Sequence, residues 1–131
     1  MAYLSEIDRV DSLIQHFWKN GFLTLSRKHS KYLPNPSKIG EFEVDAIGKQ
    51  DKKFILGLTL TQEDINNPKI LRKIKFLANQ RNKYSLKLVT LFLGVHESLI
   101  PQAKKIISKL EETTQKQIKI VSTSAEENLF D

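Results

Sequence analysis

The chain has 131 residues, of which 40% are hydrophobic and 27% are charged, and these values predict one globular domain over residues 1–131. It contains no cysteine, which excludes disulfides, thiolate zinc sites and a cysteine nucleophile. No apolar run approaches the roughly 20 residues of a membrane span, and the N-terminus lacks the features of a signal peptide. We therefore expect a cytoplasmic protein that has no membrane partner.

The net charge of +6 is unevenly distributed along the chain. Residues 12–40 and 65–96 contain lysine and arginine but no acidic residue. Segregation of this kind predicts a basic surface that binds a polyanion such as DNA. A solvated lysine-rich face is the alternative.

The first quarter of the chain predicts a helix, a strand and a loop. Apolar residues recur at three- and four-residue steps between Ser5, a predicted N-cap, and Asn20-Gly21, which predicts an amphipathic helix. Phe17 and Trp18 are expected in its buried stripe. A strand is expected over residues 22–27, followed by a long basic loop with two prolines over residues 29–40.

Residues 41–60 predict a β-hairpin that turns between residues 48 and 52. Because side chains alternate along a strand, Glu41, Glu43 and Asp45 are expected to share one face. Three carboxylates on one face of a strand indicate either a metal ion or a nearby basic surface.

The second half of the chain alternates helices and strands. We expect a helix that begins at Asn67-Pro68, a buried strand over residues 86–95, a helix opened by Pro101 and an edge strand over residues 118–122. The acidic C-terminal tail either frays or docks through Leu129 and Phe130 on a partner. The order αβββαβαβ predicts an α/β fold in which helices flank a mixed sheet.

Three short segments carry a resemblance to a known family. They are the end of the first helix with its Gly21-Phe22 exit, Arg27-Lys28-His29-Ser30 after the first strand, and Val44-Asp45-Ala46-Ile47 in the hairpin. These segments resemble the PD-(D/E)xK, or restriction-endonuclease-like, superfamily, and most closely its archaeal Holliday junction resolvase branch. The resemblance covers roughly residues 5–95 and implies a restriction-endonuclease-like mixed sheet.

The resemblance also implies a site for Mg²⁺ or Mn²⁺. Metal-dependent cleavage of DNA uses two carboxylates to hold the metal ion and a lysine to orient the attacking water. Asp45 matches the family's first metal-binding aspartate. Gly57 and Thr59 stand where the family has Glu-x-Lys, and Val10 stands nearest to the glutamate of the first helix, with Glu6 about one turn earlier.

Other side chains could replace the missing groups. Glu43 shares the predicted face of Asp45 and is the candidate second metal ligand, and Lys53 is the candidate catalytic lysine. Lys73 is an alternative lysine, and Glu63 or Asp64 could reach back from the end of the strand. The structural alternative is that Glu43 and Asp45 only form ion pairs with Arg27 or Lys53.

Three hypotheses about function remain open. The first is a DNA-binding protein of nuclease-like fold with a decayed or rearranged catalytic site. The second is an active Mg²⁺- or Mn²⁺-dependent deoxyribonuclease or junction resolvase with migrated ligands, and the third is a protein-interaction module without a nucleic-acid role. The resemblance implies a homodimer, and the candidate DNA contacts are Arg27, Lys28, Ser30, Lys31, Lys73 and Lys75.

Overall fold

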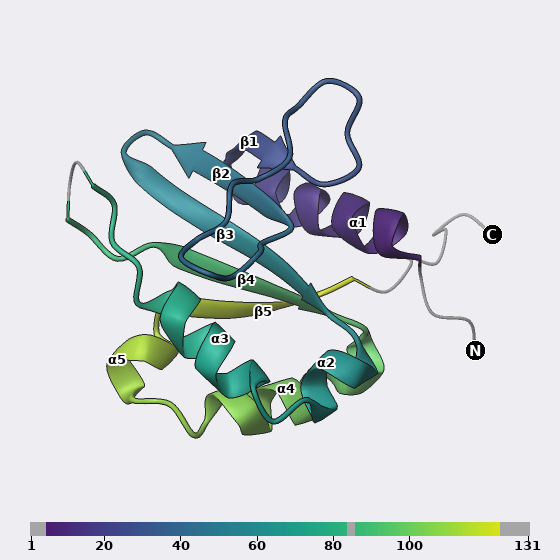
Figure 1. The fold of residues 1–131 in the computed structure, drawn as a ribbon, viewed down its shortest axis with the longest axis vertical. Coiled ribbons are helices and arrows are strands. Elements are labelled where there is room, and N and C mark those ends of the chain that lie inside the picture. Colours follow the sequence, from purple (N-terminus) through teal and green to yellow (C-terminus); the bar gives the residue numbers. More distant parts are fainter. Residues whose placement is uncertain (1–4, 84–85, 124–131) are drawn as a thin grey trace.

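The computed structural model describes residues 5–83 and 86–123, which form a five-stranded mixed sheet with helices on both faces (Figure 1). The strands lie side by side in chain order, and β2 is antiparallel to β1 and β3, whereas β3, β4 and β5 are parallel. The predicted α/β class with a mixed, helix-flanked sheet is therefore confirmed. The strand bounds are β1 (Leu23–Arg27), β2 (Ala46–Gln50), β3 (Lys53–Leu60), β4 (Thr90–Val95) and β5 (Ile118–Ser122).

Helix α1 (Glu6–Lys19) covers one face of the sheet (Figure 1). As predicted, Ser5 caps it by accepting the backbone N–H of Asp8 at 3.2 Å. Its buried side chains pack against β2, β3, β4 and β5, and they are Val10, Leu13, Ile14 and Phe17. Trp18 is 63% exposed, so its predicted place in the core is wrong.

The other helices lie on the opposite face (Figure 1). They are α2 (Gln62–Asn66), α3 (Ile70–Ala78), α4 (Ile100–Ile107) and α5 (Glu112–Gln115), with a 3-10 turn, η1 (Glu97–Leu99), before α4. Apolar side chains from α2, α3, η1, α4, β3 and β4 form most of the larger core cluster. The sequence predicted α3 and α4 but missed α2, which Thr61 and Asp64 start with a capping box.

The hairpin differs from the prediction in its turn and in its first strand. β2 begins only at Ala46, and the turn lies at Asp51-Lys52, where Asp51 has a left-handed φ of 53°. Residues 41–45 precede the strand, and Glu41 contacts Arg72 on α3 at 3.4 Å. Glu41 therefore does not share a strand face with Asp45, which corrects that prediction.

Asp45 lies where the chain enters the sheet, at an irregular position. Its N–H donates to the carbonyl of Gly57 at 2.8 Å, while Ala46 is paired opposite the same Gly57. Two residues opposite one is the arrangement of a β-bulge, which breaks the alternation of side chains. Val44 accordingly packs in the cluster that includes α3, while Ala46 packs in the cluster under α1.

The last two strands predicted from the sequence agree with the structure to different extents. The expected strand over residues 86–95 is regular only from Thr90, because Leu86 adopts a left-handed φ of 59° and Leu88 forms an isolated bridge with Arg81. The predicted edge strand is confirmed as β5.

The C-terminal tail with Leu129 and Phe130 lies outside the described residues. No helix within residues 5–83 and 86–123 is long and apolar enough to cross a membrane.

Candidate functional site

The centre of the candidate site is the side chain of Asp45, of which only 7% is exposed. Its Oδ2 atom accepts two hydrogen bonds from Thr59, from the backbone N–H at 2.7 Å and from the hydroxyl at 3.0 Å. Its Oδ1 atom faces the Nζ of Lys28 at 3.3 Å. Both oxygens of this buried carboxylate are thus compensated, as burial of a charge requires.

Lys28 lies among three carboxylates that come from two parts of the chain. Besides Asp45, its Nζ lies 3.7 Å from Glu43 Oε1 and 3.9 Å from Glu6 Oε1. Glu6 belongs to the first turn of α1, whereas Lys28 directly follows β1 and is held there by its N–H, which donates to the Asp45 carbonyl at 3.0 Å. The structure therefore brings Glu6, rather than the fully buried Val10, to the site.

The electrostatics of this cluster favour a charged Lys28. Burial by itself lowers the pKa of Lys28, but the attraction of Asp45, its hydrogen bond and the charges of Glu43 and Glu6 together raise that pKa above 10.5. Lys28 is therefore an ammonium ion at neutral pH. It supplies a positive charge beside Asp45, the side chain that the sequence offered as a metal ligand.

The cluster borders an open hollow of about 280 Å³. Lys73 of α3 and Asp64 of α2 line it together with Asp45. Three of the side chains that the sequence offered as replacements, Glu43, Asp64 and Lys73, thus reach this hollow. Lys53 does not, because it is paired with Gln50 at the hairpin turn, at the other end of β3 from Thr59.

Gly57 and Thr59, which the resemblance aligns with Glu-x-Lys, are both in close contact with neighbouring residues. A Cβ atom on Gly57 would lie 2.7 Å from Leu13 Cδ2 and 2.8 Å from Phe17 Cζ, so α1 fills the space that a glutamate would need. Thr59 is committed to Asp45 through both hydrogen bonds. Neither position can recover its charge without displacing these neighbours.

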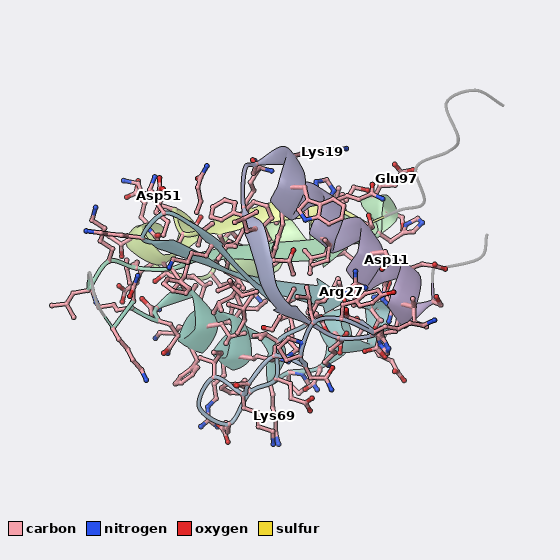
Figure 2. The ribbon with its side chains drawn as sticks, turned by 90° about the horizontal axis from the view of Figure 1, so that it is seen from above. Asp11, Lys19, Arg27, Asp51, Lys69 and Glu97 are labelled. Carbon is pink, nitrogen blue, oxygen red and sulfur yellow. The ribbon has the colours of Figure 1, made fainter. Side chains whose placement is uncertain are left out.

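The side chains predicted to contact DNA differ in how far they are engaged within the protein. The guanidinium of Arg27 pairs with Asp11 of α1 (Figure 2), and the hydroxyl of Ser30 accepts the N–H groups of Tyr32 and Leu33 inside the loop. Arg27, Lys28 and Ser30 are thus occupied within the protein. Lys31 and Lys75 are exposed, and Lys73 is half-buried beside the hollow.

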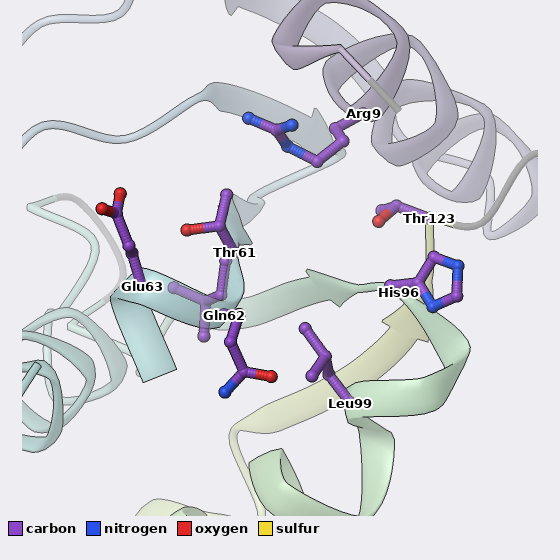
Figure 3. Close-up of a pocket in the computed structure, with 8 residues that line it drawn as sticks. Arg9, Thr61, Gln62, Glu63, His96, Leu99 and Thr123 are labelled. Atoms are coloured by element: carbon purple, nitrogen blue, oxygen red, sulfur yellow. The ribbon is translucent and has the colours of Figure 1, made fainter. Parts of the chain in front are cut away.

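A second hollow, of about 290 Å³, lies at the ends of β3, β4 and β5 (Figure 3). Arg9 and Thr61 border both hollows. Leu60, Leu99 and Thr123 line the second hollow (Figure 3), and the hydroxyl of Thr123 is buried. Sequence reasoning singled out neither Arg9 nor Thr61, because only the crossing of α1 over the end of β3 brings them together.

The cluster does not fit a resident divalent metal ion. Within the described parts of the chain, no three histidine, aspartate or glutamate side chains are arranged to hold a metal ion. The ammonium of Lys28 stands between the carboxylates that Mg²⁺ or Mn²⁺ would need. Comparison of the chain with family models, curated proteins and solved structures finds no match.

Proposed function

We propose that the chain is a DNA-binding protein of restriction-endonuclease-like fold in which Lys28 replaces the catalytic metal ion. The observation that carries this proposal is the position of the Lys28 ammonium, within 4 Å of Asp45, Glu43 and Glu6. A cation at this point neutralises the carboxylates and leaves them without a role as metal ligands. The site keeps Asp45, which matches the family's first metal-binding aspartate, but here Asp45 forms an ion pair with Lys28.

The fold supports the relationship that the sequence motifs suggested. One helix precedes three consecutive strands that pair as an antiparallel meander, and the following strands are added in parallel. Asp45 enters this meander beside Gly57 and Thr59, which are the positions that the resemblance assigned to the active site. The homodimer that the resemblance implies is part of the same proposal.

The DNA-binding surface would consist of exposed cations on the proline loop and on α3. Lys31 and Lys38 lie on the loop, and Lys69, Arg72 and Lys75 lie on or next to α3. The end of the loop lies against α3, because a Cβ atom on Gly40 would lie 2.7 Å from Phe76 Cζ. Just after the loop, the ring of Phe42 lies 5.3 Å from that of Phe76. If about four of these cations contact phosphates, the log–log salt dependence of binding would have a slope of about −3.6.

The test is a pair of assays on the full chain. Duplex and four-way DNA should be retarded in gels at about 50 mM salt and released at about 300 mM, and neither should be cleaved in Mg²⁺ or Mn²⁺. Replacing Lys31 and Lys75 together by alanine should weaken binding, whereas the same change at the exposed Lys104 and Lys105 of α4 should not. Cleavage that vanishes in Asp45→Ala would overturn the proposal.

One observation favours the second candidate, an active nuclease. Glu6, Asp45, Asp64 and Lys73 line one hollow, so carboxylates and a lysine from three helices and the strand entry surround the same space. Metal-dependent cleavage would require Lys28 to move away from Asp45. In that case cleavage would depend on Glu6 and Lys73 as well as on Asp45.

A further inference from the structure

A groove of about 510 Å³ lies along β2 and β3, on the face of the sheet that packs against α3. The proline loop forms one side of it through Lys38, and the segment after α3 forms another through Arg81 and Lys83. Its strand side is apolar and consists of Ile47, Phe54 and Leu56. None of the candidate site residues or DNA contacts predicted from the sequence lines this groove.

The charge of the groove is of one sign. Lys38, Arg81 and Lys83 contribute three positive charges, and none of the described residues that line it is acidic. Lys49 adds a fourth cation nearby, since its Nζ lies 5.6 Å from the centroid of the Phe54 ring. A positive rim around an apolar strand surface selects an occupant that carries both negative charge and flat apolar faces.

A single DNA strand has these two properties. Its phosphates match the cations, and its unpaired bases expose apolar faces that stack on aromatic side chains. Phe54 is half-buried, and it is the aromatic residue among the described residues that line the groove. A protein partner would need an acidic and apolar segment, but the charge distribution of the chain already favours a polyanion. Double-stranded DNA presents phosphates but keeps its base faces stacked.

We infer that the groove between Lys38, Phe54 and Lys83 binds unpaired DNA. This inference rests on the proposed DNA-binding function and makes it more specific, because the groove would hold a single strand while the basic surface of the proline loop and α3 holds duplex. Lys38 lies at the border of the two surfaces. The protein would then recognise DNA in which duplex and unpaired segments meet.

The experiment measures fluorescence anisotropy of a labelled oligothymidine of about 12 nucleotides on the full chain. Three phosphate contacts predict a log–log salt slope of about −2, or a loss of about 20-fold in affinity between about 50 and 200 mM salt. Replacing Lys38 and Lys83 together by alanine should reduce the slope to about −0.7. The matched control is the double alanine variant at Lys104 and Lys105, which removes the same charge from α4.

Phe54→Leu tests the stacking contribution while an apolar side chain is kept in the groove. It should weaken binding of the oligothymidine about fivefold or more and leave duplex affinity unchanged. Thermal unfolding followed by circular dichroism shows that the variant is folded at the assay temperature. An unchanged affinity in Phe54→Leu, or an equal loss of affinity in both lysine double variants, would overturn the inference.

Two further outcomes separate the inference from the function on which it rests. If the protein retards duplex DNA but does not bind the oligothymidine, the groove assignment is wrong and the proposed function stands. If it binds no DNA at about 50 mM salt, both are wrong. A tenfold preference for an RNA strand of the same length would contradict the assignment to DNA.

Discussion

Replacing Lys28 by methionine tests the central feature of the site most directly. The substitution keeps an unbranched side chain of similar length but removes the ammonium from between the three carboxylates. Asp45 then remains buried, and it keeps the two hydrogen bonds from Thr59 but loses its ion pair with Lys28. We expect the variant to fold with a lower free energy of unfolding.

The magnitude follows from distance and exposure. At 3.3 Å the attraction between Lys28 and Asp45 is about 5 kcal/mol at an effective dielectric constant of about 20. The exposed partners Glu43 and Glu6 add less than about 1 kcal/mol each. Breaking a buried pair costs about 3–5 kcal/mol, but Lys28 is 28% exposed and regains solvation when it is unpaired. We therefore expect a loss of about 2–3 kcal/mol.

The assay is a double-mutant cycle in urea at pH 7 with Lys28→Met, Asp45→Asn and the double variant. The coupling energy between the two sites should be about 2 kcal/mol, because each single variant leaves one charge without its partner. Lys104→Met on the exposed face of α4 is the control and should change stability by less than about 0.5 kcal/mol. Additivity of Lys28→Met and Asp45→Asn within about 0.5 kcal/mol would refute the reasoning.

Three further predictions concern the same cluster. Gly57→Glu should cost more than about 3 kcal/mol and produce no cleavage, because its side chain would enter the space of Leu13. Gly57→Ala should cost about 1–3 kcal/mol in the same urea titrations. Thr59→Val keeps the N–H bond to Asp45 but loses the hydroxyl bond, and should cost about 1.5 kcal/mol, whereas a change under about 0.3 kcal/mol would show that the hydroxyl bond is unimportant. Since the pKa of Lys28 is raised above 10.5, the stability that Lys28 contributes is fully present below pH 10.5 and is lost as pH rises through the raised value. Melting curves of wild type and Lys28→Met should therefore converge only above pH 10.5, and convergence near pH 8 would contradict this.

The regular elements could be predicted because their signals are local. The Ser5 cap and the apolar stripe of α1 lie within one helix, and the length and composition of β3 and β5 mark them as strands. Trp18 shows the limit of such signals. Periodicity finds a broad apolar stripe, but the sheet covers only part of it, so Phe17 is fully buried and Trp18 is not.

The candidate site could be predicted only in part, because its contacts join segments that are far apart in sequence. Asp45 was singled out from the sequence. Its hydrogen bond to Thr59, however, depends on the irregular entry of residues 45 and 46 opposite Gly57, which no local sequence pattern predicts. Lys28 was expected to contact DNA because it lies in a basic segment. Its role as the partner of Asp45 follows from the backbone bond between Lys28 and Asp45, which only the assembled sheet contains.

The competition between Lys28 and a metal ion gives a final prediction. A divalent ion about 4 Å from the Lys28 ammonium would meet a repulsion of about 8 kcal/mol at an effective dielectric constant of about 20. Because the raised pKa keeps Lys28 charged at neutral pH, the ion can approach Asp45 only after Lys28 has moved. Mn²⁺ should therefore raise the melting temperature of Lys28→Met more than that of wild type, and the gain should disappear when Asp45→Asn is added. An equal or larger shift in wild type would show that Lys28 does not take the place of the metal ion, and would favour the active nuclease instead.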